Sequence, residues 1–304
     1  SGPPVVEFEG VQRHFGEPEF VLDDVSFQIQ RGDVVGLLGK NGAGKTTLIR
    51  MVLGMLHPHR GHVRVFGVDP RDEPVSVKQR IGFVSDAQVL PPYLRAREVF
   101  ALDAGLFPTW DEPLAQSLKE RFEIAGAKKI REMSKGEARR VAVACAIAHR
   151  PELLLLDEPS SGFDPAARRE FLEIALEHLT DTGSTILFSS HQLDDVERLA
   201  NRILFLQGSR LVLDEPLEDL QEAYTLLVAK GGPTQVTELR ASSLCVTARV
   251  VGDNVHGLFR GSDAQARKMA VRLSPELKPA TRPPRLEEVF IELAESKVQP
   301  RELR

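Results

Sequence analysis

The sequence contains few cysteines, few aromatic residues and no long apolar run. Cys145 and Cys245 are the two cysteines among 304 residues and stand far apart, so we expect free thiols in a reducing compartment rather than a disulfide framework. The longest apolar runs, Val141–Ala148 and Leu153–Leu156, are much shorter than the roughly 20 residues that a membrane-spanning helix requires. A formal net charge of −5 gives no electrostatic reason to expect nucleic-acid binding.

The remaining composition is that of a globular chain. Hydrophobic residues make up 42% and charged residues 27%, which allows a sizeable core, and the length favours one large domain or one domain with an appendage. No signal peptide is visible at the start, where Ser1-Gly2-Pro3 is typical of a tag remnant. We therefore expect a cytoplasmic chain whose role at a membrane, if any, depends on a partner.

A glycine-rich stretch matches the pattern G-x-x-x-x-G-K-[ST] between an apolar run, Val34–Leu38, and a helix-like segment, Leu48–Leu53. Glycine lets a loop curl so that backbone N–H groups surround a triphosphate, and the helix that follows adds its positive dipole end. We expect Lys45 to contact the β- and γ-phosphates, as one of the catalytic residues, and the Thr46 hydroxyl to bind a magnesium ion. The expected nucleotide-binding residues of this stretch are Gly39, Asn41, Gly42, Ala43, Gly44, Lys45, Thr46 and Thr47.

Two carboxylates follow the apolar run Leu153–Leu156, which predicts a fully buried parallel strand. Ligands of open α/β sheets bind beyond the carboxyl ends of the strands. Asp157 is therefore a candidate for the magnesium shell, and Glu158 a candidate base that polarises a water for attack on the γ-phosphate. The next predicted strand, Thr185–Ser189, brings His191 to the same edge, where this residue is expected to orient water or phosphate.

Phe15 has two interpretations. It follows the first of two alternating segments, Val5–Glu9 and Val25–Gln30, which predict half-buried antiparallel strands. A phenylalanine at a strand end is often a core residue. Near a nucleotide loop, it is also a candidate platform on which an adenine ring stacks.

Ser134 also has two interpretations. Ser134 and Glu137 have the spacing of a capping box before a helical segment, Arg139–His149, which predicts that the serine is a helix N-cap. One interpretation is a helix start and nothing more. In the other, the serine, Gly136 and the helix dipole form a second anion site.

The rest of the chain is predicted from periodicity. Tyr93–Ala127 has a helical pattern, with Val99, Leu102 and Leu106 expected on one apolar face. Ile203–Leu213 predicts a hairpin that closes a domain near Pro216. Further strands are expected over 224–229, 244–251 and 255–259, followed by a helix that docks through Leu286, Val289, Phe290 and Leu293.

Taken together, these motifs resemble, in order and rough spacing, those of the nucleotide-binding subunit of ATP-binding cassette (ABC) transporters. The motifs are the phosphate loop, Ser134–Glu137, Asp157-Glu158, Asp164 and His191. The resemblance covers about residues 5 to 216. It implies an α/β fold with a P-loop NTPase core, an antiparallel β subdomain and a helical subdomain at about 87–150. Residues 1–216 would form this ATPase domain, and 217–304 a small α+β accessory domain.

The resemblance also implies partners and cofactors. Two subunits, in a homodimer or a heterodimer, would face each other head to tail. Each ATP, with Mg²⁺, would lie between the phosphate loop of one subunit and Ser134, Gly136 and Glu137 of the other. Closure would drive an integral membrane permease, which places the chain at the inner face of the cell membrane. The ending Pro284–Phe290 resembles that of bacterial export-type subunits that handle drugs, peptides or lipids. Ser134–Glu137 corresponds to the segment called the signature in this family, and this segment together with Phe107–Asp111 resembles the bacitracin- and acetoin-type branch.

Two departures from the family pattern remain. Asp86 occupies the place where the family has a glutamine that reaches the magnesium and senses the permease, with Gln88 two residues on; Asp86 is therefore an expected metal residue alongside Thr46 and Asp157. In the signature, Lys135 replaces a glycine and Glu137 a glutamine. A soluble cassette ATPase that acts in complex assembly or on ribosomes without a permease is an alternative, as is a catalytically poor partner in a heterodimer.

Overall fold

The computed structural model of the chain describes residues 2–16, 20–87, 90–159, 163, 168–171, 173–174, 177, 183–190, 193–273 and 278–295. The chain divides into two compact units, Ser1–Leu211 and Val212–Arg304, whereas the predicted boundary lies after residue 216. Four residues named above, Ser1, Gln88, Asp164 and His191, lie outside the described residues.

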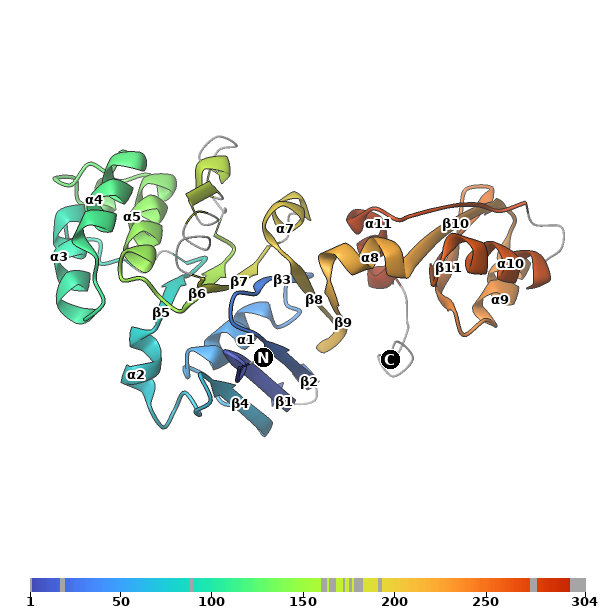
Figure 1. Cartoon of the computed structure of the whole chain (residues 1–304), viewed down its shortest axis with the longest axis horizontal. Coiled ribbons are helices and arrows are strands. Elements are labelled where there is room, and N and C mark those ends of the chain that lie inside the picture. The colour runs from blue at the N-terminus through green and yellow to red at the C-terminus, as the bar shows by residue number, and fades with distance from the viewer. Residues whose placement is uncertain are drawn as a thin grey trace. The chain divides into compact units, whose positions relative to one another are not determined.

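A six-stranded sheet forms the centre of the first unit, with the strand order β5-β6-β7-β3-β8-β9 (Figure 1). The pairs β5/β6, β6/β7, β7/β3 and β3/β8 are parallel. β6 and β7 are buried along their whole length, which confirms the fully buried strand that the apolar run Leu153–Leu156 predicts for β6. The strands are β3 (Val34–Gly39), β5 (Ile81–Val84), β6 (Leu153–Asp157), β7 (Thr185–Ser189), β8 (Arg202–Gln207) and β9 (Arg210–Pro216).

A second sheet of three antiparallel strands has the order β2-β1-β4. Its strands are β1 (Val6–His14), β2 (Phe20–Ile29) and β4 (Arg60–Val65). Helix α1 (Lys45–Val52) contributes Leu48 and Ile49 to a core that also contains Phe8 of β1 and Leu155 of β6. The helix that follows the glycine-rich loop is thus fixed between the two sheets, as Figure 1 shows.

The helical part of this unit comprises α3 (Ala96–Leu106), α4 (Glu112–Arg121), the short 3-10 helix η1 (Ile130–Glu132) and α5 (Lys135–Ala148), which lie together in Figure 1. The first unit also contains α2 (Pro74–Gln79) and α7 (Leu193–Leu199). Among the described residues, no helix combines the length and the apolar character that crossing a bilayer requires.

The apolar face predicted for α3 is wrong. Val99 is buried, but Leu102 and Leu106 are 46% and 57% exposed. The buried residues of the helix are Ala96, Val99 and Phe100, whose i, i+3, i+4 spacing centres the inner face away from Leu102. Leu106 is the last residue of the helix.

Strand β5 and helix α5 approach each other closely at Gly82. A Cβ atom at this position would lie 2.3 Å from the backbone oxygen of Ala146 and 2.9 Å from a methyl group of Leu154. Only glycine allows this approach. The close contact therefore sets the position of α5 relative to the sheet.

The second unit contains an antiparallel sheet with the strand order β11-β12-β10-β13. Its strands are β10 (Tyr224–Lys230), β11 (Cys245–Val251), β12 (Asn254–Arg260) and β13 (Ala280–Arg282). Its helices are α8 (Leu217–Ala223), α9 (Pro233–Arg240), α10 (Asp263–Leu273) and α11 (Leu286–Glu295). Leu286, Val289 and Leu293 of α11 are buried, which confirms that this helix docks. Both cysteines are free, as expected.

Candidate active site

The glycine-rich loop follows β3 and opens α1. Gly42 and Gly44 have φ values of 82° and 104°, a region that residues with a side chain rarely adopt. A Cβ atom on Gly44 would also lie 2.6 Å from the backbone oxygen of Val21. Asn41, Gly42 and Thr46 are exposed, so these parts of the loop and the first turn of α1 are accessible from outside.

Lys45 supplies a buried cation at this loop. Its side chain is held by the loop itself, because Nζ donates to the backbone oxygen of Gly39 at 2.7 Å and to that of Lys40 at 3.4 Å. Burial lowers the pKa of Lys45, while the negative charges of Glu158 and then Asp157 oppose this shift. The ammonium group therefore lies in the field of the acidic pair at the end of β6.

Asp157 is fixed by two hydroxyl groups. Thr46 Oγ1 donates to Asp157 Oδ2 at 2.9 Å, and Ser189 Oγ donates to Oδ1 of the same carboxylate at 2.7 Å. The backbone N–H of Glu158 donates to Ser189 Oγ at 2.9 Å. The sequence predicts no role for Ser189. Its position as a polar residue at the end of the apolar strand β7 is the sequence feature that could have indicated a place in the site.

Glu158 adopts an unusual backbone conformation, with φ at 49°. A residue with a side chain enters this left-handed region at a cost of about 1 kcal/mol or more, and such residues cluster at functional sites. The turn takes the chain away from β6 directly after the two carboxylates. Glu158 is therefore at the carboxyl end of the strand, as its sequence context predicts.

The donor set at this edge suits a magnesium ion. Thr46 and Asp157 offer a hydroxyl and a carboxylate, which are hard oxygen ligands. In the part of the chain that the structure describes, no cluster of three or more His, Cys, Asp or Glu side chains is arranged for a metal. Magnesium needs no such cage, because it keeps several waters and binds substrate phosphates. The residues present therefore fit a magnesium ion that arrives with a nucleotide.

The structure places Asp86 differently from Thr46 and Asp157. Its carboxylate is exposed and lies 3.6 Å from Nη2 of Arg139. The hydroxyl of Thr46 contacts Asp157. The structure thus brings together two of the three expected metal residues and pairs the third with an arginine that sequence reasoning did not single out.

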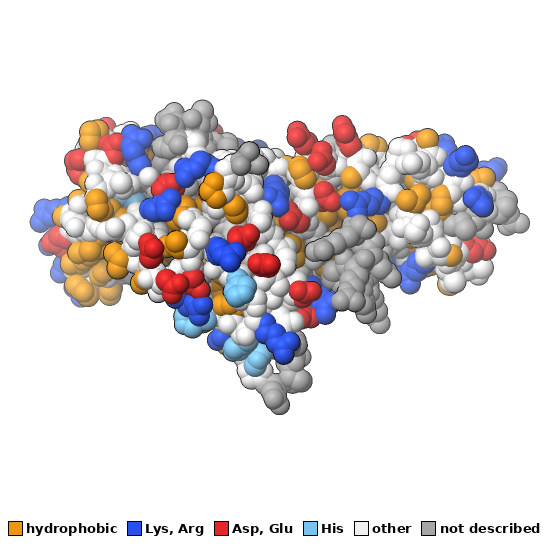
Figure 2. Space-filling view, turned by 60° about the horizontal axis from the view of Figure 1, so that its bottom comes forward, with side chains coloured by type: hydrophobic (Ala, Val, Ile, Leu, Met, Phe, Trp, Pro, Cys, Tyr) orange, Lys and Arg blue, Asp and Glu red, His pale blue; other side chains and the backbone are white. Residues whose placement is uncertain are grey.

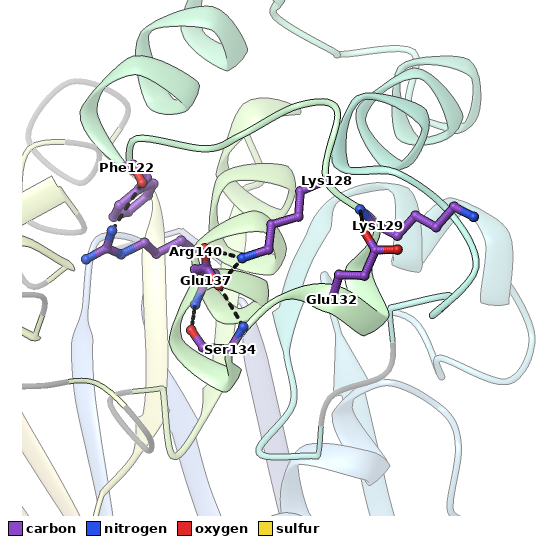
Figure 3. A network of polar contacts seen from close by, with 7 residues as sticks. All are labelled: Phe122, Lys128, Lys129, Glu132, Ser134, Glu137 and Arg140. Atoms are coloured by element: carbon purple, nitrogen blue, oxygen red, sulfur yellow. Dashed lines mark hydrogen bonds and ion pairs between the residues drawn. The ribbon is translucent and has the colours of Figure 1, made fainter.

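Ser134 is the N-cap of α5, as its spacing to Glu137 predicts. Ser134 Oγ accepts a hydrogen bond from the backbone N–H of Glu137 at 3.1 Å, and Glu137 Oε2 accepts one from the N–H of Ser134 at 2.7 Å. Figure 3 shows this reciprocal pair and a further ion pair between Glu137 and Lys128, whose Nζ lies 2.8 Å from the carboxylate. The hydrogen bond from Lys128 is the largest cause of the lowered pKa of Glu137.

These contacts divide the signature residues into two kinds. The Glu137 carboxylate accepts hydrogen bonds from Lys128 and from the backbone N–H of Ser134, both in its own subunit. Ser134 and Lys135 are exposed, and Gly136 lies in the first turn of α5. The free N–H groups and positive dipole end of a 14-residue helix thus lie beside a serine hydroxyl at the surface.

Phe15 is not a core residue. Its side chain is 56% exposed, and the guanidinium of Arg13 lies over its ring at 4.8 Å from the centroid. Arg13 Nη1 in turn donates to the backbone oxygen of His57 at 2.9 Å. Figure 2 shows histidine side chains near basic ones on the surface of this unit. An exposed aromatic ring backed by a cation remains available for stacking.

A glycine-rich loop lies between strand β3 and helix α1, and its threonine contacts an aspartate at the end of β6, two places away in the same sheet. This arrangement defines a P-loop nucleotide-binding protein. Residues 22–161 match the model of the ABC transporter family. The ABC transporter ATP-binding protein YtrB of Bacillus subtilis is 34% identical over 204 residues, which span 67% of this chain and 70% of that protein. The Nod factor export ATP-binding protein I of Rhizobium etli is 31% identical over 296 residues, 95% of this chain and 92% of that protein.

The fold agrees with these relatives. A solved ATP-binding subunit of an ABC transporter superposes with a TM-score of 0.67 at 27% identity, covering 71% of this chain and 92% of that one. The chain therefore belongs to the ABC transporter family, in which it is an ATP-binding subunit and an ATP hydrolase.

Proposed function

We propose that this chain is the ATP-hydrolysing subunit of a bacterial ABC exporter, and that two nucleotide-binding subunits enclose each ATP between them. The observation that carries the proposal is the contact of Thr46 with Asp157, because it joins the phosphate loop to the strand end that bears Glu158. Three reactive groups, a buried ammonium, a hydroxyl and a carboxylate pair, thus meet at one edge of the sheet.

Each of these groups has a proposed role. Lys45 neutralises the β- and γ-phosphates, and the backbone N–H groups from Gly39 to Thr47 surround them. Thr46 and Asp157 hold Mg²⁺, which supplies charge neutralisation to the phosphates when bound. Glu158 accepts a proton from the attacking water. Phe15 stacks against the adenine ring.

Ser134 and Gly136 are proposed to complete the site of a second subunit. The exposed N-terminus of α5 is suited to an anion, while the hydrogen bonds given above keep its serine and Glu137 in a fixed geometry. A γ-phosphate presented by another copy would meet the hydroxyl, the helix dipole and the N–H of Gly136. In this arrangement ATP contacts both subunits and thereby stabilises their association.

A cavity beside α5 is the proposed docking site for the membrane permease. It has a volume of about 640 Å³ and is bordered by β5 and by Ser85 and Asp86, which follow this strand. Its lining includes apolar side chains such as Met55, Phe83 and Phe107 together with charged ones such as Lys78 and Arg139. This mixture suits a short amphipathic segment of a partner. Docking there would hold the chain at the inner face of the cell membrane.

The proposal of export is supported by the second unit of the chain. The relative named for Nod factor export aligns over 95% of this chain, so the similarity extends beyond the ATPase unit. We propose that residues 217–304 form an accessory domain of an export-type subunit.

Co-purification tests this proposal. The chain, expressed with the products of its neighbouring genes, should bring down an integral membrane protein that stimulates its magnesium-dependent ATP hydrolysis, and the stimulation should disappear in the Lys45→Ala variant. Stable association with ribosomes and no membrane partner would instead support the soluble alternative. An inactive chain that gains activity only with a different cassette subunit would identify a heterodimer.

A further inference from the structure

Arg139 is a largely buried arginine in α5, the helix that Ser134 caps. It lies in α5, five residues after the N-cap Ser134, and its side chain is only 9% exposed. Arginine is rarely buried without partners, because a desolvated guanidinium must recover its lost hydration through hydrogen bonds and opposite charge. The partners of Arg139 therefore indicate what this residue does.

The guanidinium reaches across to the residues that follow β5. Nη1 donates to the backbone oxygen of Ser85, and Nη2 donates to that of Asp86 at 2.9 Å. The carboxylate of Asp86 completes the contact at 3.6 Å from Nη2. A planar guanidinium can serve two carbonyls at once, which a lysine ammonium does less well. Arg139 thus fastens α5 to the carboxyl end of β5.

The same cation acts on the acidic pair of the neighbouring strand. Burial lowers the pKa of Arg139, and the negative charges of Asp86, then Asp157 and, more weakly, Glu158 oppose this shift. Lys45 interacts with the same two carboxylates from the phosphate loop. The acidic pair therefore lies in the field of two partly buried cations, one from α1 and one from α5.

Neighbouring arginines show that this arrangement is particular to Arg139. Arg140, the next residue, donates to the backbone oxygen of Phe122 at 3.3 Å. Arg150, just beyond the other end of α5, pairs with Asp111 at 2.6 Å and is half exposed. These contacts lie within the helical part of the unit, whereas Arg139 connects it to the sheet.

We propose that Arg139 is a positioning residue that couples helix α5 to the end of strand β5 in its own subunit. It holds the first turns of α5, with Ser134, in a fixed relation to Ser85 and Asp86, the residues that follow β5. A displacement of the chain at Asp86 is then transmitted to Ser134 through the side chain of Arg139. This inference rests on the proposed function, because Ser134 acts there on the nucleotide of the second subunit.

Three variants of the full chain test the proposal. Arg139→Gln should lower kcat for ATP at least tenfold, whereas the Kd for a fluorescent ATP analogue should stay within twofold, because the phosphate loop is untouched. Arg139→Lys keeps the charge and should recover part of kcat, and it carries the test if Arg139→Gln does not fold. Arg150→Gln, the matched control, should keep kcat within twofold. A wild-type kcat in both Arg139 variants, or an equal loss of kcat and of ATP binding, would overturn the proposal.

A double variant tests the pairing with Asp86. If Asp86 acts through Arg139, Asp86→Asn should cost no more than twofold in kcat when added to Arg139→Gln, since contacting residues are not additive. If the two losses multiply, the pairing is wrong and Asp86 acts on its own. Failure of the proposed function gives a different result. The Glu158→Gln chain would then hydrolyse ATP as fast as the wild-type chain, whatever the Arg139 variants do.

Discussion

The hydroxyl of Thr46 donates a 2.9 Å hydrogen bond to Asp157, a residue 111 positions further along the chain. The other oxygen of that carboxylate accepts from Ser189 at 2.7 Å. Because both oxygens are engaged, the carboxylate has one defined orientation. The single chain thus pre-organises the edge at which we propose that Mg²⁺ and the γ-phosphate bind.

Replacement of the Thr46 hydroxyl tests the proposed metal site. Thr46→Val keeps the shape of the side chain but removes a proposed ligand and the hydrogen bond to Asp157. The Mg²⁺ concentration that gives half-maximal ATP turnover should rise about 10- to 100-fold. Thr46→Ser, which keeps the hydroxyl, serves as the control. An unchanged Mg²⁺ dependence in the valine variant would remove Thr46 from the metal site.

Glu158→Gln tests the proposed base. The amide keeps the size of the side chain but cannot accept the proton, so turnover should fall by about two to four orders of magnitude. Binding of ATP should remain. Glu152→Gln is a control just before the same strand, where Glu152 pairs with Arg31 and Arg80, and it should keep turnover within about twofold. Equal turnover in Glu158→Gln and wild type would exclude this carboxylate as the base.

The close approach at Gly82 makes a stability prediction. In Gly82→Ala the new methyl would lie 2.3 Å from the backbone oxygen of Ala146, and the resulting shift of α5 should cost about 1–3 kcal/mol of unfolding free energy. Gly105→Ala on α3 meets no atom within 4 Å and should be neutral or stabilise by about 0.5–1 kcal/mol. Urea unfolding of both variants measures the difference. A Gly82→Ala chain as stable as wild type would contradict the packing described here.

The start of α11 gives a pH-dependent prediction. Glu288 pairs with Arg282 and accepts a 2.8 Å hydrogen bond from the N–H of Arg285. The hydrogen bond from Arg282, ahead of the other causes, lowers the pKa of Glu288 from 4.5 to about 2. A carboxyl whose folded-state pKa is depressed stabilises the fold above its unfolded pKa. This contribution is lost as the pH falls from about 4.5 towards 2.

Thermal unfolding checks this sign. Glu288→Gln should melt below wild type at pH 7, and the difference in Tm should shrink between pH 4.5 and 2. Glu287→Gln, one position earlier on α11, changes the same charge without removing this contact. A difference that stays constant with pH, or one that equals the effect of Glu287→Gln, would show that the Arg282 pair does not stabilise the unit.

Much of the site could be predicted because its signals are local in sequence. The glycine spacing before Lys45 and the apolar run before Asp157 each define a strand end and its loop. The capping box of Ser134 and Glu137 likewise fixes a helix start within four residues. Such patterns depend on backbone geometry over a few positions, so that one sequence suffices to recognise them.

Other features depend on contacts between distant parts of the chain. The engagement of Asp157 by Ser189 and the pairing of Arg139 with Asp86 arise only when strands and helices pack. The inner face of α3 was misjudged at Leu102 because periodicity shows which residues are apolar, not which neighbour covers them. Helices α9 and α10 are not predicted for a related reason. Both have low overall hydrophobicity, and each contributes only a few side chains to the core, Val236 and Leu239 from α9 and Ala266 and Ala270 from α10.

The most direct test of the central claim is ATP-dependent pairing of the Glu158→Gln chain, measured as molar mass in solution with and without Ser134→Asp. Aspartate is as good an N-cap as serine, so α5 should persist, but its charge would repel a γ-phosphate from a second copy. We predict that the Glu158→Gln chain doubles its mass with ATP, that Ser134→Thr in this background does the same, and that Ser134→Asp binds ATP yet remains single. Pairing of the Ser134→Asp chain as tight as that of its parent would contradict the claim that this serine closes the nucleotide site of another copy.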